Sequence, residues 1–206
     1  MIQIISMRKI FRPDKKEVWK QLADQLDAVY VEGGFAKPDK VEIHVKEWIV
    51  TLDTYVVYAN NAPIHFTHMR APYINADNFR FTIYRKGFFT GIAKLAGMQD
   101  FEVGFPEFDD AFVIKGADEG KLRALFANPK IRELIEAQPS IKLQVRDDEG
   151  WFGKHFPEGV DELRFEVTGI IKDIERLKQL FDLFAEVLNH LCHIGSAYEN
   201  DPNVAL

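Results

Sequence analysis

The alternation of apolar and polar residues between positions 41 and 85 restricts this fold more than any other feature of the chain. Apolar residues occupy every second position from Val41 to Val45, and the alternation resumes on the other parity from Trp48 to Leu52. A period of two is typical of half-buried strands, and the break at Lys46–Glu47 predicts a bulge or a tight turn. Because the connections are short, we expect antiparallel pairing. Further strands are predicted at 55–58, 64–69 and 79–85.

A second pattern follows in the middle of the chain and predicts a strand with a pair of helices. The apolar run 111–114 is rich in aromatic and β-branched residues, which indicates a strand buried on both faces. Asp118 is placed to cap a helix, and Asn128–Pro129 to begin a second one. Gln138–Pro139 ends the pattern, because the residue before a proline disfavours helical geometry.

Two more helices are expected at the ends of the chain. Residues 13–31 carry an apolar stripe at helical spacing after Asp14, a candidate cap, and Gly33–Gly34 are expected to end that helix. A longer helix is expected from Asp173 to about Gly195, with a stripe of leucines and phenylalanines. Its first residues, 173–181, are similar to 118–126, which indicates either a repeated strand–helix unit or two ordinary capped helices.

These elements together predict the α+β class with a mainly antiparallel sheet. The strands form a meander, with closure into a barrel-like, PH-like shape as the alternative, because periodicity does not distinguish the two. The N-terminal helix, a central helix pair and a long C-terminal helix accompany the sheet. We expect one domain spanning 1–206, with a frayed tail from residue 196. Strands are also expected at 141–145 and 163–167, and 87–97 is expected to be a short helix or a loop.

Composition favours a soluble cytoplasmic protein. The 206 residues are 47% apolar, which suffices for one well-filled core. No run approaches the ~20 apolar residues of a membrane-spanning helix, and the first residues do not fit a signal peptide. The one cysteine excludes an intramolecular disulfide framework and fits a reducing compartment.

Charge is distributed unevenly along the chain. The net charge is −6, which argues against a general nucleic-acid-binding protein. Residues 64–97 nevertheless hold five bases and one acid, whereas residues 98–206 hold 22 acids and 12 bases. The basic segment is followed by aromatic residues, so it predicts a surface for an anionic ligand or for anionic lipid. The alternative is that its cations pair with the many acids downstream. The candidate ligand-binding residues are Arg80, Tyr84, Arg85 and Lys86.

Metal and cofactor chemistry has little support in the sequence. His190, Cys192 and His193 lie near a helix end, but Cys192 points away from His193 by helical geometry, so packing is the favoured interpretation. His65 and His68 have an odd spacing within a strand and are expected to face opposite sides. Phosphate-binding glycine loops and nucleophile motifs are missing, so we expect no cofactor and no catalytic residue. The acids beside the strand at 111–114 keep a metal-dependent hydrolase open as an alternative, through Asp109 and Asp110.

Several short motifs resemble those of a family of uncharacterised bacterial proteins, a domain of unknown function. The resemblance covers roughly residues 40–190 and implies no activity, because none is established for that family. The residues that carry it are Leu52–Asp53, Tyr84–Arg85, Gly97–Asp100, Phe108–Asp109, Phe112–Gly116 and Asp118–Glu119.

Three functional hypotheses follow from the sequence. The leading one is a non-enzymatic binding or scaffold module that recognises an anionic ligand or a membrane surface. The second is the metal-dependent hydrolase. The third is a homo-oligomeric structural protein assembled through the final helix, although that stripe is more simply explained by packing on the sheet.

Overall fold

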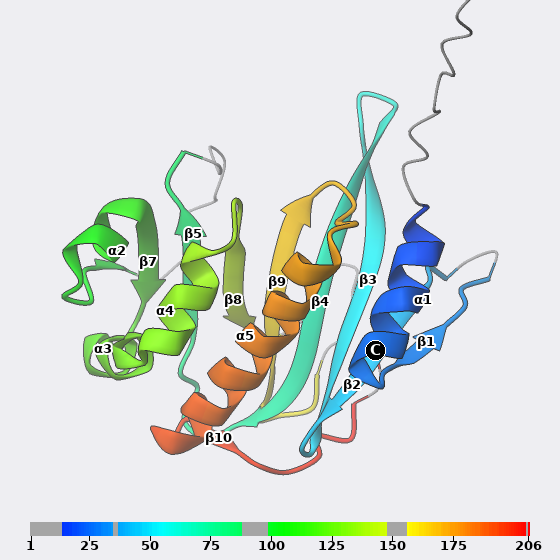
Figure 1. Cartoon of the computed structure of the whole chain (residues 1–206). Helices are drawn as coiled ribbons and strands as arrows, with labels where there is room; N and C mark the ends of the chain where they lie inside the picture. The colour runs from blue at the N-terminus through cyan, green and yellow to red at the C-terminus, as the bar shows by residue number, and fades with distance from the viewer. Residues whose placement is uncertain (1–13, 35–36, 88–98, 148–155, 205) are drawn as a thin grey trace, which may run out of the picture.

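A computed structural model describes residues 14–34, 37–87, 99–147, 156–204 and 206 (Figure 1). The chain alternates between strands and helices in an order that the sequence only partly predicts. The helices are α1 (Lys15–Leu26), α2 (Pro106–Ala111), α3 (Glu119–Ala127), α4 (Pro129–Glu136) and α5 (Ile174–His193). The strands are β1 (Val29–Val31), β2 (Lys40–Val45), β3 (Trp48–Ala59), β4 (Ala62–Asn75), β5 (Phe81–Arg85), β6 (Gln99–Phe101), β7 (Phe112–Gly116), β8 (Lys142–Arg146), β9 (Val160–Thr168) and β10 (Ala197–Tyr198).

All of these strands join one antiparallel sheet, which confirms the α+β prediction. The order is β1-β2-β3-β4-β9-β8-β5-β7-β6, and β10 pairs with β4. Within the described residues, β1 and β6 lie at opposite ends of this order and do not pair with each other, so the sheet is open. The barrel-like, PH-like alternative is therefore wrong. The strands after β4 also pair out of chain order, so only β1 to β4 form a meander.

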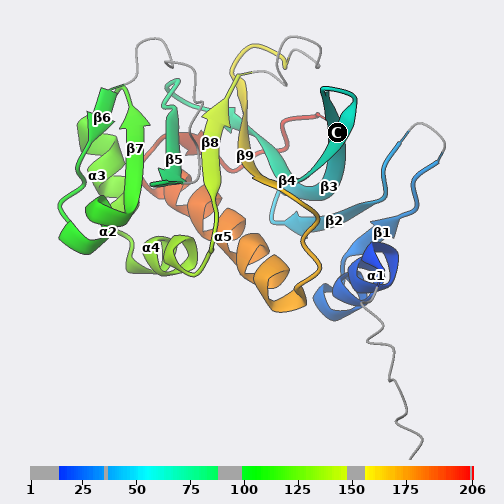
Figure 2. The ribbon, with the colours of Figure 1, turned by 90° about the horizontal axis from the view of Figure 1, so that it is seen from above.

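The helices lie along one side of the sheet (Figure 2). The longest, α5, crosses that side diagonally and buries its apolar stripe against the strands. The stripe that the sequence predicts is therefore part of the chain's own core and is not a surface for a second copy. Its buried members are Leu177, Leu180, Phe181, Leu183, Phe184, Val187, Leu188 and Leu191.

The N-terminal helix is shorter than predicted. Asp14 caps it as expected, but Asp27 adopts a left-handed conformation with φ 52°, and its backbone N–H bonds to the carbonyl of Ala23. Val29 and Tyr30, which were expected to extend the apolar stripe of the helix, instead pair with β2. A short run of apolar residues does not by itself distinguish the last turn of a helix from an edge strand.

Two neighbouring strands are longer than predicted. The turn at Lys46, where φ is 53°, confirms the break between β2 and β3. β3 then continues without interruption from Trp48 to Ala59, and β4 runs through Pro72 to Asn75. Pro72 is accommodated although proline lacks the N–H that a central strand needs, and it lies opposite Glu162 in β9.

The central helices begin where their caps predict. The side chain of Asp118 accepts a hydrogen bond from the Lys121 amide, and that of Asn128 from the Lys130 amide. One further helix, α2, was not predicted. It begins at Pro106 and contains Asp109 and Asp110. The sequence places those acids beside the strand at 111–114 and does not predict a helix there. The expected helix or loop at 87–97 lies almost entirely outside the described residues.

The C-terminal tail is not frayed at the point where fraying was expected. Gly195 ends the α5 region with φ 74°, as predicted, but Ser196 is buried and Ala197–Tyr198 pair with the end of β4. The hydroxyl of Ser196 also donates to Asp77, 3.0 Å away. A few main-chain and side-chain bonds thus fix the residues that follow α5.

Candidate functional site

Arg80 is held by acids of the same chain. Its guanidinium donates to both carboxylate oxygens of Asp161, each 3.0 Å away, and to Asp147 at 2.8 Å. The hydrogen bonds to Asp161 raise the pKa of Arg80, because they stabilise its charged form. Asp161 is buried, so this bidentate pair joins the start of β9 to the segment before β5. The interpretation in which the basic segment pairs with downstream acids fits Arg80.

Arg85 and Lys86 contact main-chain carbonyls. Arg85 donates to the carbonyls of Glu136 and Gln138 at 2.8 Å, and its guanidinium lies 4.6 Å from the centre of the Phe112 ring. Lys86 donates to the carbonyl of Asp109 at the end of α2. These contacts satisfy carbonyls that helix ends leave without an intrahelical partner. Ligand binding by these residues stays a prediction.

Lys86 also lines a pocket of about 480 Å³ beside β6 and β7. The lining includes four acids and only two bases, Lys86 and Arg123. The pocket is therefore poorly matched to an anion. The acids are Asp100, Glu102, Asp109 and Glu119.

Asp109, the candidate metal ligand, organises a loop. Its carboxylate accepts hydrogen bonds from the backbone amides of Val103, Gly104 and Phe105, at 2.9–3.0 Å. Three such donors at the start of α2 account for a carboxylate at this position without a metal. Among the residues that the structure describes, no group of three or more histidines, cysteines or acids is placed to hold a metal ion.

The histidines near the end of α5 contact other parts of the chain or each other. The Nε2 atom of His190 lies 3.0 Å from the carbonyl oxygen of Ala124 in α3, and the rings of His190 and His193 are 5.3 Å apart. Burial raises the pKa of the Cys192 thiol above its usual value. The packing interpretation fits these contacts.

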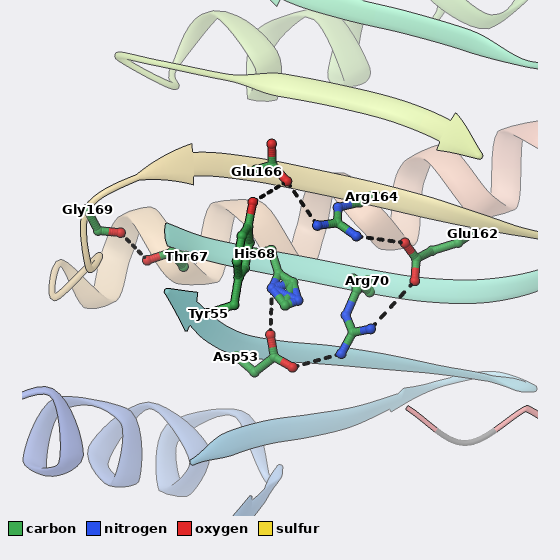
Figure 3. Close-up of polar contacts among 9 residues, drawn as sticks. All are labelled: Asp53, Tyr55, Thr67, His68, Arg70, Glu162, Arg164, Glu166 and Gly169. Atoms are coloured by element: carbon green, nitrogen blue, oxygen red, sulfur yellow. Dashed lines mark hydrogen bonds and ion pairs between the residues drawn. The ribbon is translucent and has the colours of Figure 1, made fainter. Parts of the chain in front are cut away.

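A different set of polar residues lies on the side of the sheet away from the helices (Figure 3). Of these, the sequence drew attention only to His68, as a metal candidate with His65, and to Asp53, within a short motif. Its first part joins β3 and β4. Asp53 and His68 are direct partners across these strands, with Asp53 Oδ1 2.7 Å from His68 Nδ1. Asp53 Oδ2 accepts a hydrogen bond from Arg70 at 2.8 Å. One buried carboxylate thus contacts an imidazole and a guanidinium at once.

The two protonation equilibria in this group favour ionised Asp53 and neutral His68. Burial lowers the pKa of His68, and the charges of Arg70 and Arg164 lower it further, against the opposing effect of Asp53. Burial raises the pKa of Asp53, but His68 and Arg70 outweigh that effect, so the pKa lies below its usual value. The imidazole is therefore neutral at neutral pH.

The second part joins β3 to β9 and β8. Glu166 accepts hydrogen bonds from the hydroxyl of Tyr55 at 2.7 Å and from Arg164 at 2.9 Å, and Lys142 lies 3.6 Å away. Burial raises the pKa of Glu166, but these three neighbours outweigh it and lower the pKa overall. Burial and Glu166 both raise the pKa of Tyr55, so its hydroxyl keeps its proton and donates.

Arg70 and Arg164 are the centre of this polar face. They are direct partners in the β4–β9 register, and the side chains are only 11% and 10% exposed. Like charges directly opposite each other destabilise a sheet unless acids offset them. Glu162 lies between the two, with carboxylate oxygens 3.9 Å from Arg70 and 3.7 Å from Arg164. These distances are longer than hydrogen bonds, whereas Asp53 and Glu166 are bonded closely.

The antiparallel register extends this face into two rows of side chains that cross six strands. One row consists of Thr51, Arg70, Arg164, Gln144, Thr82 and Lys115. The neighbouring row consists of Asp53, His68, Glu166, Lys142, Tyr84 and Val113, in which an ion pair joins Glu166 to Lys142. On β4, β9 and β8 this face holds four bases and two acids. The bases are Arg70, Arg164, Lys142 and Arg146, and the acids are Glu162 and Glu166. Of the candidate ligand-binding residues predicted from the sequence, Tyr84 is the one within these rows.

The contacts of the pair Asp53–His68 bear on catalysis. An aspartate that holds a histidine ring is how many hydrolases orient a general base. Among the described residues, the aromatic ring packed against His68 is that of Tyr55, with 4.9 Å between the ring centres. The charged groups near His68, apart from Asp53, are the arginines Arg70 and Arg164. Neither a serine nor a cysteine takes part in these contacts. The arrangement is thus better suited to holding charge than to nucleophilic chemistry.

Comparisons with known proteins provide one structural likeness. Neither a search of protein-family models nor a search of curated proteins finds a match, so the resemblance to an uncharacterised bacterial family stays a prediction. Among solved structures, the chain is similar to the mycobacterial trehalose monomycolate transport factor A, TtfA. The TM-score is 0.54 at 7% identity, and the match covers 87% of this chain and 96% of the other. At that identity the likeness concerns the fold alone.

Among the described residues, no helix combines the length and the hydrophobicity that crossing a bilayer needs.

Proposed function

We propose that this protein is a non-enzymatic binding module that recognises a carboxylate or phosphate group on the polar side of its sheet. The observation that carries the proposal is the pairing of Arg70 and Arg164 across β4 and β9. Two guanidinium groups side by side match the planar, two-oxygen geometry of carboxylate and phosphate. A purely structural face would not need two like charges in direct opposition.

The surroundings of the arginine pair support an anionic ligand. Lys142 and Arg146 lie on the adjacent strand β8, and Tyr84 follows on β5, opposite Lys142. Asp53 and Glu166 hold the two guanidinium groups in place, which reduces the entropy that binding costs. The net charge of the whole chain is −6, so this concentration of bases is local.

The fold likeness is compatible with this role. The similar solved structure is that of a transport factor, and a protein that takes part in transport binds other molecules. The proposal for this chain rests on its own arginine pair, because a likeness at 7% identity does not transfer a ligand. The surface predicted from the sequence, Arg80, Tyr84, Arg85 and Lys86, is the rival location for the same ligand class, and of these residues Tyr84 also lies on the polar face.

A titration with inorganic phosphate and with succinate tests the proposal. We expect both anions to raise the melting temperature, because a ligand that binds the folded state stabilises it. The variant Arg164→Lys keeps the charge but loses the bidentate geometry, so we expect about tenfold weaker binding. The double variant Lys115→Ala/Lys142→Ala removes two cations from the polar side of the sheet, so we expect it to weaken anion binding.

A second double variant, Arg123→Ala/Lys130→Ala, is the matched control. It also removes two cations from ion pairs, but from α3 and α4 on the other side of the molecule. We expect it to bind the anions as the unmodified protein does. Equal loss of affinity in the two double variants would show that net charge alone matters. Absence of any anion effect on the unmodified protein would reject the proposed site.

A further inference from the structure

The tip of the β3–β4 hairpin is a two-stranded ribbon that extends beyond its neighbours (Figure 1). Pairing of β2 with β3 ends at Leu52, and pairing of β4 with β9 begins only at Phe66. Among the described strands, Val56 to Ala59 therefore pair only with Ala62 to His65. A ribbon of two strands is at best marginally stable without further support. Its length is therefore not explained by the stability of the sheet.

Apart from His65 at its base, the ribbon carries no acidic or basic side chain, and it exposes large apolar residues. Residues 54–64 contain no acid, lysine, arginine or histidine. Val56 is 41% exposed, Val57 45% and Tyr58 74%. Consecutive residues of a strand point to opposite faces, so both faces of the ribbon present apolar surface. Asn60 and Asn61, with φ of 49° and 63°, form the turn at the end.

These properties distinguish the environments that the ribbon fits. A flat protein surface covers one face of a ribbon and leaves the other in water. The interfacial layer of a bilayer surrounds a projecting element on both faces. Tyrosine is enriched in that layer, where its ring meets the acyl boundary and its hydroxyl meets water. Free edge amides and carbonyls keep the ribbon out of the hydrocarbon core, and the asparagine amides can bond to headgroups.

We propose that residues 56–63, the tip of the β3–β4 hairpin, insert into the interfacial layer of a lipid bilayer. The contact is apolar, so it does not require anionic lipid and does not depend on the arginine pair. It adds a lipid surface as a partner to the binding role proposed above. The two proposals are independent, because either surface functions without the other.

Vesicle flotation tests the hairpin. We expect the unmodified protein to float with phosphatidylcholine vesicles and to float similarly when phosphatidylglycerol is added. Tyr58→Asp and Val57→Asp place a charge in the interfacial layer, so we expect each to reduce the bound fraction at least about fivefold.

The chain offers matched controls for both substitutions. Tyr198 is 55% exposed on β10, at the opposite end of β4, and Val29 is 56% exposed on β1. Tyr198→Asp and Val29→Asp therefore add the same charge at similar exposure away from the hairpin. We expect these variants to float as the unmodified protein does. Circular dichroism of every variant checks that the fold is kept.

Three outcomes would overturn the proposal. The first is an unmodified protein that stays at the bottom of the gradient with both vesicles. The second is equal flotation of Tyr58→Asp and Tyr198→Asp. The third is a solution mass of a dimer that Tyr58→Asp converts to a monomer, because the ribbon would then contact a second copy. None of these results bears on the anion titration.

Discussion

Asp53 on β3 lies 2.7 Å from His68, its direct partner on β4, and its other carboxylate oxygen accepts a hydrogen bond from Arg70. This contact holds a neutral imidazole against an ionised carboxylate within a buried, charged face. The same face continues through Arg164 and Glu166 into β8. Polar residues that a strand pattern assigns to solvent are here fixed to one another.

The pair makes stability depend on pH in a defined window. The pKa of His68 is lower in the folded protein than the usual value of about 6.5. Between the lower pKa of the folded state and the usual pKa, the unfolded chain therefore binds more protons than the folded protein. The free energy of unfolding falls as pH drops below about 6.5. Replacing His68 with Gln removes this titration. We expect the free energy of unfolding of His68→Gln to vary less with pH between 6.5 and 5, measured by urea denaturation.

The comparison needs a reference histidine. His44→Gln, which alters an exposed side chain on β2, is the comparison variant. If His68→Gln keeps the full pH dependence, the imidazole does not titrate as its surroundings predict.

Arg164 is expected to be structurally costly to remove. Arg164→Met would leave Glu162 and Glu166 without their shared guanidinium in a buried setting. Removing one partner of a buried ion pair costs about 3 kcal/mol or more. We expect a loss of that order in the free energy of unfolding. The exposed pair Arg123–Glu119 provides the comparison, because Arg123→Met should cost about 0.5 kcal/mol or less. Similar losses in the two variants would mean that the polar face contributes no more than an ordinary surface pair.

Thr67 anchors the connection from β9 to α5. Its hydroxyl donates to the carbonyl of Gly169 at 2.7 Å and accepts from the Ile171 amide at 3.0 Å. Thr67→Val keeps the shape but leaves both main-chain groups without this partner. We expect a loss of about 2 kcal/mol in thermal or urea unfolding, because each unsatisfied buried group costs about 1–3 kcal/mol. Thr67→Ser, which keeps the hydroxyl, should retain most of the stability, and a large loss there would point to packing instead.

Substitution of Asp109 distinguishes a structural role of this carboxylate from a role as a metal ligand. Asp109→Ala removes the acceptor of three backbone amides, so we expect a loss of about 1–2 kcal/mol in stability. Mg²⁺, Mn²⁺ and Zn²⁺ should not raise the melting temperature of the unmodified protein. Stabilisation by one of these ions that disappears in Asp109→Ala would support the hydrolase alternative.

The fold class was accessible from sequence because burial imposes simple periods. The alternation of apolar and polar residues predicted the strands β2 and β3. The capping residues Asp118, Asn128 and Asp173 predicted where three helices begin. The order of the later strands was not accessible. It depends on which long-range pairs form, and no local pattern specifies that β5 lies between β8 and β7.

The polar face was missed for a related reason. Arg70 and Arg164 alternate with apolar neighbours, as do residues on any solvated strand face. Only the register shows that they lie side by side and that Asp53 and Glu166 flank them. The one available signal was the charges at 162, 164 and 166, which alternate with Leu163 and Phe165 in β9. Arg80 and Arg85 attracted attention instead, because they are close together in sequence.

The most direct test of the proposed function is a phosphate titration of isotopically labelled protein followed by NMR. The account predicts saturable shifts centred on the side chains of Arg70 and Arg164, with smaller shifts at Lys142, Arg146 and Tyr84. Shifts confined to Arg80, Arg85 and Lys86, or an unchanged spectrum, would contradict it.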